Sequence, residues 1–389
     1  MARILITSEL GTGYGHFAKA LLLSRAFGER GHQVFAAVKH FDGKSAVEGM
    51  HVIPAPEWPP GISRPGVAVS YAEILARRGY CMPQRLTEML RRWASVISRA
   101  APDLLIADHA PTALLAARIA GVASARIGTG FGAPPATTPL PPLLAEDGRT
   151  EEREKIEALV LEAINRSLLE LGAAPVPSLH AGISPQRDFL CTFREFDHYP
   201  QRGAAAYMGP LFARSEAHPP EDYCTGEQGI FCYVASAMEG FSDFCAALQL
   251  TGLPVLMHAR GLGASEAARL ESNQFRVAVK PVDIPAAAAM SRLVITHGGH
   301  GATSSALLAG CPVLMLPQQV EQLMFARRLE SQRLAVIAPA GGSIADIREA
   351  IEKLLADSDL GVAVNDFAEL HRGYDPLLTA MRIVSATFA

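Results

Sequence analysis

The sequence contains no long uninterrupted apolar run. Its longest apolar stretch, residues 104–125, carries Asp108, His109 and Arg118, whereas a membrane-spanning helix needs about 20 predominantly apolar residues. Residues 1–7 enter an apolar strand directly, without the basic region, hydrophobic core and cleavage site of a secretory signal. We therefore expect no transmembrane helix, no integral membrane association and a cytoplasmic protein.

Cysteine and basic charge are also sparse. The six cysteines form no Cys-x-x-Cys pair and are too few for a disulfide framework in a chain of 389 residues. We expect reduced thiols at Cys81, Cys191, Cys224, Cys232, Cys245 and Cys311. The formal net charge of -4, without a basic block, provides no electrostatic footprint for nucleic acid or an anionic membrane surface. Small-molecule chemistry remains as the default.

The chain does contain enough apolar sequence for stable cores. Hydrophobic residues make up 49% and charged residues 19%, which excludes disorder as the main state. At about 150 residues per domain, the length predicts two domains. Apolar runs at 3–7 and 33–38 flank a glycine-rich turn and an amphipathic stretch, and a similar unit recurs over 104–128. Because parallel strands need a helical crossover, this order predicts a parallel sheet.

A polar segment at 213–228 separates this half from a second one and is predicted to be a linker. A second α/β series follows, with strands expected at 230–235, 254–258, 276–279, 293–296, 312–316 and 335–337. The predicted fold class is α/β, with two doubly wound, Rossmann-like parallel-sheet domains facing each other across a cleft. We also predict that the proline-rich segments 41–66 and 130–144 form long surface loops near a pocket.

The strongest local motif lies in the second half, where the apolar run 293–296 leads through His297-Gly-Gly-His300-Gly301 into a helix. Glycines let a ligand approach the backbone, and the amides and dipole at a helix start suit a diphosphate. A tight turn without a ligand is the alternative. Two histidines three residues apart could suggest a metal, but no Cys or carboxylate ligand set lies nearby. Asp357 and Asp359 follow a helix and are predicted to form its terminal loop.

Gly11, Gly13 and Gly15 in the first half invite a dinucleotide interpretation. That pattern requires glycine where His16 stands, and the second strand ends near Lys39 and His40 instead of an acid that would bind ribose. Basic residues there suit a 2'-phosphate, so an NADP-dependent enzyme stays open as an alternative.

His16 and Asp108 are the candidate catalytic pair. His16 lies at the beginning of a predicted helix, where an imidazole can also be purely structural. Asp108 lies at the carboxyl end of a predicted strand in the same half, at the edge where open α/β sheets bind their ligands. A carboxylate that orients an imidazole and stabilises its protonated form supports general-base catalysis. The sequence alone does not show whether the two side chains touch.

Over nearly its whole length, the chain resembles the GT-B glycosyltransferases of the UDP-glycosyltransferase-like superfamily. The order and spacing of the shared motifs carry the resemblance: Gly15-His16 with Gly31-His32-Gln33-Val34, Pro102 to Asp108, Met208 to Leu211, His297 to Gly301, Ala309 to Pro312, and Pro317 to Gln322. The resemblance implies a GT-B architecture and an inverting transfer of a sugar from a nucleotide diphosphate donor to a hydroxyl acceptor. It implies no cofactor beyond the donor and no metal. The proline-rich segments 54–66 and 130–144 suggest that this acceptor is small and apolar, although they could equally be plain loop packing.

The resemblance also implies roles for domains and residues. Residues 1–212 would bind the acceptor, 213–228 would link the domains, 229–372 would bind the nucleotide sugar, and a helix in 373–389 would pack back on the first domain. His16 would be the base and Asp108 its partner. The donor-binding residues would be His297, Gly298, Gly299, His300, Gly301, Thr303, Ser304, Ser305, Glu321 and Gln322.

Three positions depart from the family pattern. Ala302 stands where the family usually has threonine, Ser305 where it has a glutamate that binds the ribose, and Glu321 where aspartate is more frequent. Ala302 and Ser305 favour an alternative, in which the protein is a catalytically impaired homologue that binds nucleotide sugars and acts as a partner or regulator. The retained His16 and Asp108 oppose it.

Overall fold

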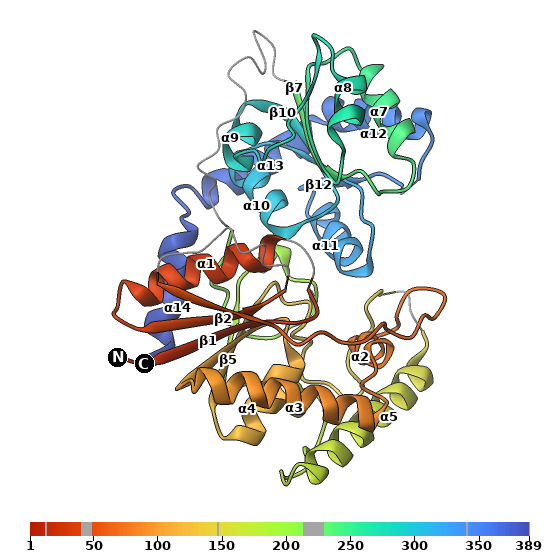
Figure 1. The fold of residues 1–389 in the computed structure, drawn as a ribbon. Helices are drawn as coiled ribbons and strands as arrows, with labels where there is room; N and C mark the ends of the chain where they lie inside the picture. The colour runs from red at the N-terminus through yellow and green to blue at the C-terminus, as the bar shows by residue number, and fades with distance from the viewer. Residues whose placement is uncertain (12–13, 40–48, 146–147, 213–228, 340, 389) are drawn as a thin grey trace. The chain divides into compact units, whose positions relative to one another are not determined.

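The computed structural model describes residues 1–11, 14–39, 49–145, 148–212, 229–339 and 341–388. The chain divides into two compact units, one formed by residues 1–213 together with 375–389 and the other by residues 214–374. The segment predicted to be a linker, 213–228, lies outside the described residues, as do Gly13 and His40. Each unit is built on its own six-stranded sheet (Figure 1).

The first unit is a doubly wound parallel sheet in the order β3-β2-β1-β4-β5-β6. Its strands are β1 (Arg3–Ser8), β2 (Gln33–Val38), β3 (Met50–Pro54), β4 (Leu104–Asp108), β5 (Ala123–Gly128) and β6 (Arg187–Leu190). Its helices are α1 (Tyr14–Gly28), α2 (Tyr71–Arg78), α3 (Pro83–Ala100), α4 (Pro111–Ala120), α5 (Thr150–Glu170), α6 (Leu179–Ile183) and α14 (Pro376–Phe388), with a short 3₁₀ turn at Arg194–Phe196. Helices α1 and α14 cover one face, and α3 and α4 cover the other (Figure 1).

Strand alternation decides which side chains of the first sheet meet α1. Leu104 and Ile106 of β4 belong to the same buried cluster as Phe17 and Leu23 of α1. Because side chains in a strand alternate between faces, Asp108 follows these two residues onto the α1 side of the sheet. Its neighbour across the ladder is Ser8 of β1. The carboxylate is therefore placed at the carboxyl edge of the sheet, under the first turns of α1.

The second unit repeats the architecture, with strand order β12-β11-β10-β7-β8-β9 and every strand pair parallel. Its strands are β7 (Gly229–Ala235), β8 (Val255–Arg260), β9 (Phe275–Val277), β10 (Ser291–Thr296), β11 (Val313–Met315) and β12 (Ala335–Ile337). Its helices are α7 (Phe241–Gln249), α8 (Ala264–Leu270), α9 (Ile284–Ala289), α10 (His300–Leu308), α11 (Val320–Ser331), α12 (Ile344–Ala356) and α13 (Ser358–Leu370). Two doubly wound sheets confirm the predicted α/β fold class.

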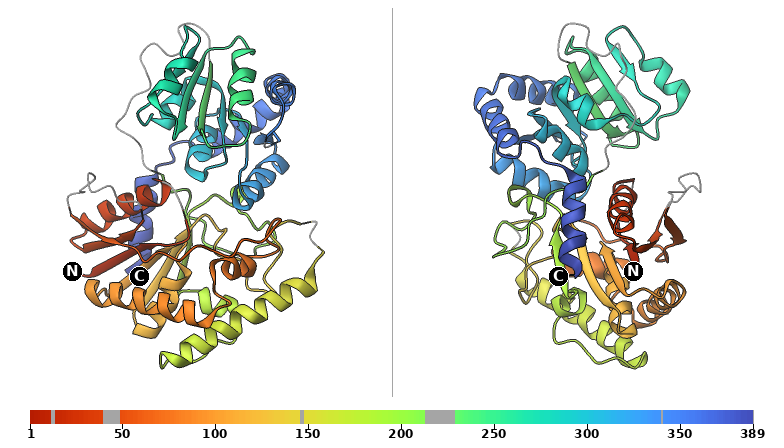
Figure 2. Two further views of the ribbon diagram at one scale, coloured as in Figure 1. Left: turned by 45° about the vertical axis from the view of Figure 1, so that its right-hand side comes forward. Right: turned by 90° about the vertical axis from the view of Figure 1, so that its left-hand side faces the viewer.

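The last helix of the chain belongs to the first unit, although the whole second unit precedes it in sequence. Ala380, Ile383 and Val384 of α14 are fully buried in the cluster formed by the first sheet and α1. Both figures show α14, in dark blue, beside the red α1 (Figures 1 and 2). Phe388 near its end stacks on His32, with ring centroids 4.6 Å apart.

Two strands and one loop differ from the sequence-based predictions. Strand β3 lies inside the segment 41–66 that was predicted to be a loop, and β6 was not predicted at all. The segment 130–144 does lack helix and strand, but much of it is buried, including Phe131, Leu140 and Leu143. The prediction of a surface loop was therefore wrong for 130–144, because its apolar side chains pack into the unit.

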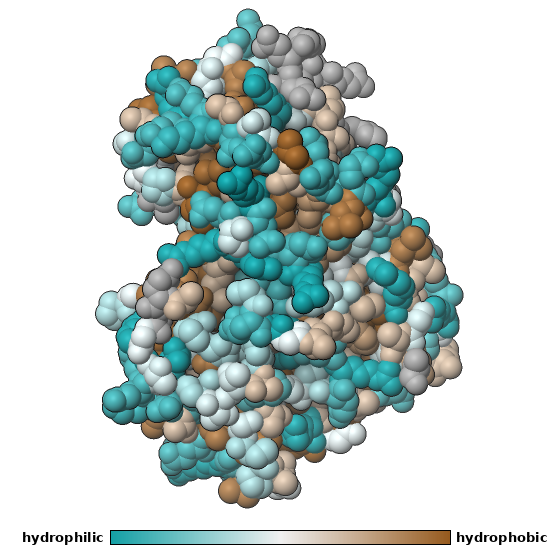
Figure 3. Space-filling view, turned by 180° about the vertical axis from the view of Figure 1, so that it is seen from behind, coloured by the Kyte–Doolittle hydropathy of each residue, from teal (hydrophilic) through white to brown (hydrophobic). Residues whose placement is uncertain are grey.

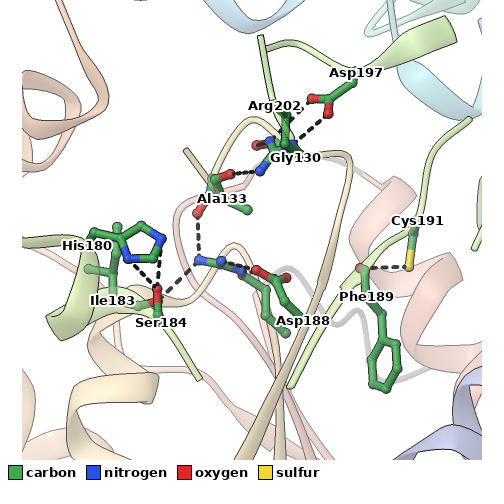
Figure 4. Close-up of polar contacts among 12 residues, drawn as sticks. Gly130, Ala133, His180, Ile183, Ser184, Asp188, Phe189, Cys191, Asp197 and Arg202 are labelled. Carbon is green, nitrogen blue, oxygen red and sulfur yellow. Dashed lines mark hydrogen bonds and ion pairs between the residues drawn. The ribbon is translucent and has the colours of Figure 1, made fainter. Parts of the chain in front are cut away.

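Arginine side chains hold this buried loop by its backbone carbonyls. Arg202 donates to the carbonyl oxygens of Ala133 at 2.7 Å and Gly130 at 3.3 Å, while its Nε lies 2.6 Å from Asp197 (Figure 4). Arg126 donates to the Gly132 carbonyl at 3.1 Å and forms an ion pair with Asp188. Because buried carbonyls need donors, these contacts stabilise a segment without secondary structure.

The described residues also settle the predictions about membrane helices and cysteines. No helix within the described ranges combines the length and apolar composition needed to cross a membrane. The face drawn in Figure 3 is hydrophilic over most of its area. The described cysteines are free thiols, and all of them except the half-buried Cys81 are buried. Asp357 caps α13, since its carboxylate accepts from the Leu360 amide at 2.9 Å.

Candidate functional site

The structure brings His16 and Asp108 together. His16 lies in the first turn of α1, and its Nδ1 is 2.7 Å from Asp108 Oδ2. The Asp108 side chain is only 3% exposed, whereas that of His16 is 22% exposed. Burial by itself would raise the pKa of Asp108, but the nearby charges and hydrogen bonds of His16 and Lys19 hold it well below the ordinary value. Asp108 is therefore an ionised acceptor for the imidazole.

Lys19 is a second partner of Asp108, and the sequence-based search missed it. Its Nζ lies 2.7 Å from Asp108 Oδ1, so the two carboxylate oxygens contact different side chains. Lys19 is buried, with a side chain 11% exposed. The sequence spacing could have indicated this contact. Lys19 follows His16 by three residues, and residues three apart on a helix lie on the same face.

Gly11 leaves room for the imidazole. A Cβ atom at position 11 would overlap the His16 ring, with Nε2 as its nearest atom. The loop before α1 therefore approaches the imidazole through a residue without a side chain. Sequence reasoning noted Gly11 for a dinucleotide site; the structure gives it a different use, as the residue that makes space for His16.

A buried carboxylate, Glu9, organises the opposite face of the same sheet edge. Its Oε1 accepts from Trp58 Nε1 at 2.6 Å and from the Thr112 hydroxyl, and its Oε2 accepts from the Thr112 amide at 2.9 Å. The Thr112 hydroxyl also lies 2.5 Å from the Tyr80 hydroxyl. Burial raises the pKa of Glu9 despite these hydrogen bonds. Glu9 thus ties the segment around Trp58 to the start of α4.

In the second unit, the predicted donor-binding residues begin where β10 ends. Gly298 adopts the left-handed region with φ of 90°, and a Cβ there would lie 3.1 Å from Met315 and 3.2 Å from Gln322. Gly299 precedes α10 and has no side chain to cap the helix. The chain therefore turns tightly at the carboxyl edge of the sheet and presents the first amides of α10 there.

The His297 side chain lies at the start of this turn. Its ring centroid is 5.9 Å from that of Tyr233 on the neighbouring strand β7. Burial lowers the pKa of His297, and the positive charge of Arg260 lowers it further. Its Nδ1 is buried and has no hydrogen-bond partner among the described residues. A neutral imidazole at this place can donate one hydrogen bond without requiring a counterion.

Two of the three hydroxyl groups predicted on α10, those of Ser304 and Ser305, are used within the helix. Ser304 Oγ donates to the His300 carbonyl at 2.7 Å, and Ser305 Oγ donates to the Gly301 carbonyl at 2.9 Å. Thr303 is fully buried. The serine hydroxyl hydrogens are thus committed to the backbone one turn earlier, which is a common use of serine in a helix. Within this motif, the glycine turn and the first amides of α10 are therefore the groups that could bind a ligand.

The remaining predicted donor residues lie in the first turn of α11. The structure places Glu321 and Gln322 there, after β11. Gln322 Oε1 accepts from the Gln318 amide at 2.8 Å, which braces the loop between β11 and α11. The ring of His300 stacks on Phe325 of the same helix, with centroids 5.0 Å apart. Loop 297–299, α10 and α11 are thus joined at the carboxyl edge, where open sheets bind ligands.

Metal ligands do not cluster in the described part of either unit. Within the described ranges, no group of three or more His, Cys, Asp or Glu side chains is placed to hold a metal ion.

Comparison with known proteins shows relatives of one kind. No protein-family model matches the chain. It is 24% identical over 309 residues to a "PGL/p-HBAD biosynthesis glycosyltransferase" of Mycobacterium tuberculosis, covering 73% of this chain and 71% of that protein. It is 26% identical over 319 residues to a "PGL/p-HBAD biosynthesis rhamnosyltransferase" of Mycobacterium bovis, covering 73% and 70%.

Solved structures share the fold over the full chain. The structure of CalG4, the calicheamicin glycosyltransferase, superposes with a TM-score of 0.71 at 19% identity and covers 100% of this chain and 98% of that one. The Streptomyces glycosyltransferase SsfS6, complexed with thymidine diphosphate, has a TM-score of 0.67 at 16% identity and covers 100% of both chains. The chain, with its two doubly wound sheets, therefore has the GT-B fold of these solved glycosyltransferases.

Proposed function

We propose that the protein is an inverting glycosyltransferase that moves a sugar from a nucleotide diphosphate donor to a hydroxyl group of a small, apolar acceptor. The observation that carries the proposal is the contact between His16 and the buried, ionised Asp108 at the carboxyl edge of the first sheet. A histidine held in this way is equipped to remove a proton from a hydroxyl.

The tautomer of His16 follows from its contact with Asp108. When Nδ1 carries the hydrogen that Asp108 accepts, Nε2 has a free lone pair. In the proposed step, Nε2 takes the proton of the acceptor hydroxyl while the oxygen forms a bond to the anomeric carbon. The bond from that carbon to the diphosphate oxygen breaks, and the diphosphate leaves with the electron pair. Attack from the face opposite the leaving group inverts the configuration, and Asp108 stabilises the imidazolium.

The second unit would bind the donor at the turn between β10 and α10. The first amides of α10 and the positive end of its dipole suit a diphosphate, and His297 adds a neutral donor beside them. The leaving diphosphate gains negative charge, so these dipoles would stabilise it without a metal ion. The thymidine diphosphate in the SsfS6 structure supports a nucleotide diphosphate as the donor's leaving group.

An apolar acceptor fits the aromatic side chains around His109, the residue after Asp108. His109 adopts φ of 50° and lies among Tyr71 and Phe131, with ring centroids 5.9 Å from each. Tyr71 and Phe131 are buried. An aromatic cluster around the residue that follows Asp108 favours an apolar or aromatic acceptor over a strongly charged one.

The test combines a donor screen with a variant of the base. Purified protein is offered UDP, dTDP and GDP sugars with apolar hydroxyl acceptors, and NMR of the product reports the anomeric configuration. We expect His16→Ala to lower turnover roughly 10²- to 10⁴-fold, because the general base is lost, while donor affinity stays within about threefold. His51→Ala, which alters an exposed histidine of the same unit, is the control and should retain activity.

Retained turnover in His16→Ala would show that another group is the base. A product with retained configuration would contradict the inverting mechanism. Donor binding by the wild-type protein without transfer or hydrolysis would favour the catalytically impaired alternative.

A further inference from the structure

Asp108 is shared by two basic side chains of one helix. His16 Nδ1 contacts Oδ2 and Lys19 Nζ contacts Oδ1, each at 2.7 Å. With its two oxygens held from different directions, the carboxylate cannot rotate without breaking one contact. This arrangement differs from a simple pair of histidine and carboxylate, because the second oxygen of Asp108 contacts the positively charged Lys19.

The charge of Lys19 has a defined effect on the imidazole. A lone ionised carboxylate favours the protonated imidazole strongly, whereas a nearby ammonium group disfavours it. Because Lys19 and Asp108 together carry no net charge, His16 experiences a weaker negative potential than it would beside Asp108 alone. The pair is buried, with side chains 11% and 3% exposed, so solvent screens this interaction only partly.

The other titratable groups near Asp108 do not supply a charge that could act on His16 in place of Lys19. The Cys191 thiol interacts electrostatically with Lys19 and Asp108, but burial raises its pKa to about 12, so it is uncharged near neutral pH. Asp188, which also acts on Cys191, is paired with Arg126.

The charged side chains on the elements next to α1 contact groups other than Asp108. Lys39, directly after β2, lies near Glu9 and Glu57, with Arg78 also close. Arg382 of α14 donates to the Met208 carbonyl at 3.0 Å, and Arg30 after α1 donates to Ser385 of α14 at 2.5 Å. Among the described side chains, the charged groups that act on Asp108 are thus His16 and Lys19.

We propose that Lys19 is a positioning residue of the site, which locks the Asp108 carboxylate and keeps the His16 imidazole in its proton-accepting form at lower pH than Asp108 alone would allow. The catalytic consequence rests on the proposed function, whereas the effect on the titration of His16 does not.

Loss of the Lys19 charge should shift the titration of His16 in one direction only. Removing the positive charge favours the imidazolium, so the His16 ring would titrate at higher pH. At low pH a larger fraction of the enzyme would then carry a protonated ring that cannot accept a proton. The acid limb of the activity profile would move to higher pH, while activity at alkaline pH would recover, because the unprotonated ring is still held by Asp108.

The experiment follows the ring signals of His16 by NMR during a pH titration, with His16→Gln used to assign them. Lys19→Gln removes the charge but keeps a hydrogen-bond donor, and Lys19→Arg keeps the charge. Arg25→Gln removes an exposed charge on the same helix and is the matched control. We expect the midpoint of the His16 titration to rise by about one pH unit in Lys19→Gln and to move less than about 0.3 units in the other two variants.

Activity profiles supply the second readout. In Lys19→Gln, kcat/KM at pH 6 should fall about tenfold relative to the wild type, and at pH 9 it should lie within about threefold of it. Thermal unfolding checks that each variant is folded; if Lys19→Gln does not fold, Lys19→Met is titrated in its place.

The outcomes separate the two proposals. An unchanged or lowered His16 midpoint in Lys19→Gln overturns the role of Lys19, even when the wild type transfers sugar. If no donor and acceptor pair gives turnover, the proposed function fails, and the NMR titration still decides the role of Lys19. A loss of activity that is equal at all pH values would mean that Lys19 only maintains the fold.

Discussion

At the scale of single residues, the site depends on a missing side chain as well as on those present. Gly11 lies against the His16 ring, and a Cβ there would overlap it. The ring cannot move aside and also keep its 2.7 Å contact with Asp108. The contact between His16 and Asp108 therefore requires glycine at position 11.

We predict that Gly11→Ala lowers kcat at least about 10²-fold, because a misplaced base loses most of its general-base contribution. Steady-state kinetics measures this, and calorimetry should show unchanged donor affinity. Gly15→Ala is the matched control, since a Cβ at position 15 meets no atom within 4 Å. Equal losses in both variants would mean that the loss does not come from displacement of the ring.

The role of Glu9 could not be predicted from the sequence. Its partners, Trp58 and Thr112, are separated from it by 49 and 103 residues, and none of the three belongs to a recognisable motif. A buried carboxylate is stable only when donors surround it. The burial of Glu9 and its donors are both properties of the folded chain.

At the scale of elements, the turn from β10 into α10 combines a strand edge with a helix start. Gly298 and Gly299 let the backbone turn there, and the first amides of α10 have no partner within the helix. His297 stands beside these amides with its pKa lowered by burial. Uncharged donors of this kind bind phosphate oxygens by hydrogen bonds and dipoles.

We predict that His297→Ala weakens binding of a nucleoside diphosphate roughly tenfold to a hundredfold, as expected for loss of a hydrogen bond to a charged group. Binding of the corresponding bare nucleoside should change little, because it lacks the phosphates. Isothermal calorimetry with UDP or dTDP against uridine or thymidine makes the comparison. If both ligands lose affinity equally, His297 acts by shaping the loop.

At the scale of the whole molecule, the chain returns to its first unit after completing the second. Helix α14 packs on α1 and buries Ile383 completely in the core of the first unit. Leu378 of the same helix is 58% exposed. The final residues of the chain are therefore part of the core that supports the helix carrying His16 and Lys19.

We predict that Ile383→Ala lowers the free energy of unfolding of the first unit by about 2 to 5 kcal/mol, through lost burial and the cavity left behind. Leu378→Ala should change it by less than about 0.5 kcal/mol, because an exposed side chain contributes little. Chemical denaturation followed by circular dichroism provides both values. Similar effects of the two substitutions would argue against α14 as part of the core.

The sequence by itself determined the repeated order of strands and helices and thereby the fold class. Apolar runs, glycine stops and helical periodicity are local signals, and they were sufficient for β1, β2, β4 and most later strands. Strands β3 and β6 were missed for a local reason as well. They have five and four residues, and each exposes two residues, so their patterns are short and mixed.

Only the tertiary structure decided which side chains meet. His16 and Asp108 are 92 residues apart, and Lys19 reaches the same carboxylate from one turn further along α1. Burial of loop 130–144 likewise depends on Arg126 and Arg202, which come from other segments. Local periodicity specifies which face of an element is buried, whereas contacts between elements depend on the register of β1 and β4 and on how α1 packs over them.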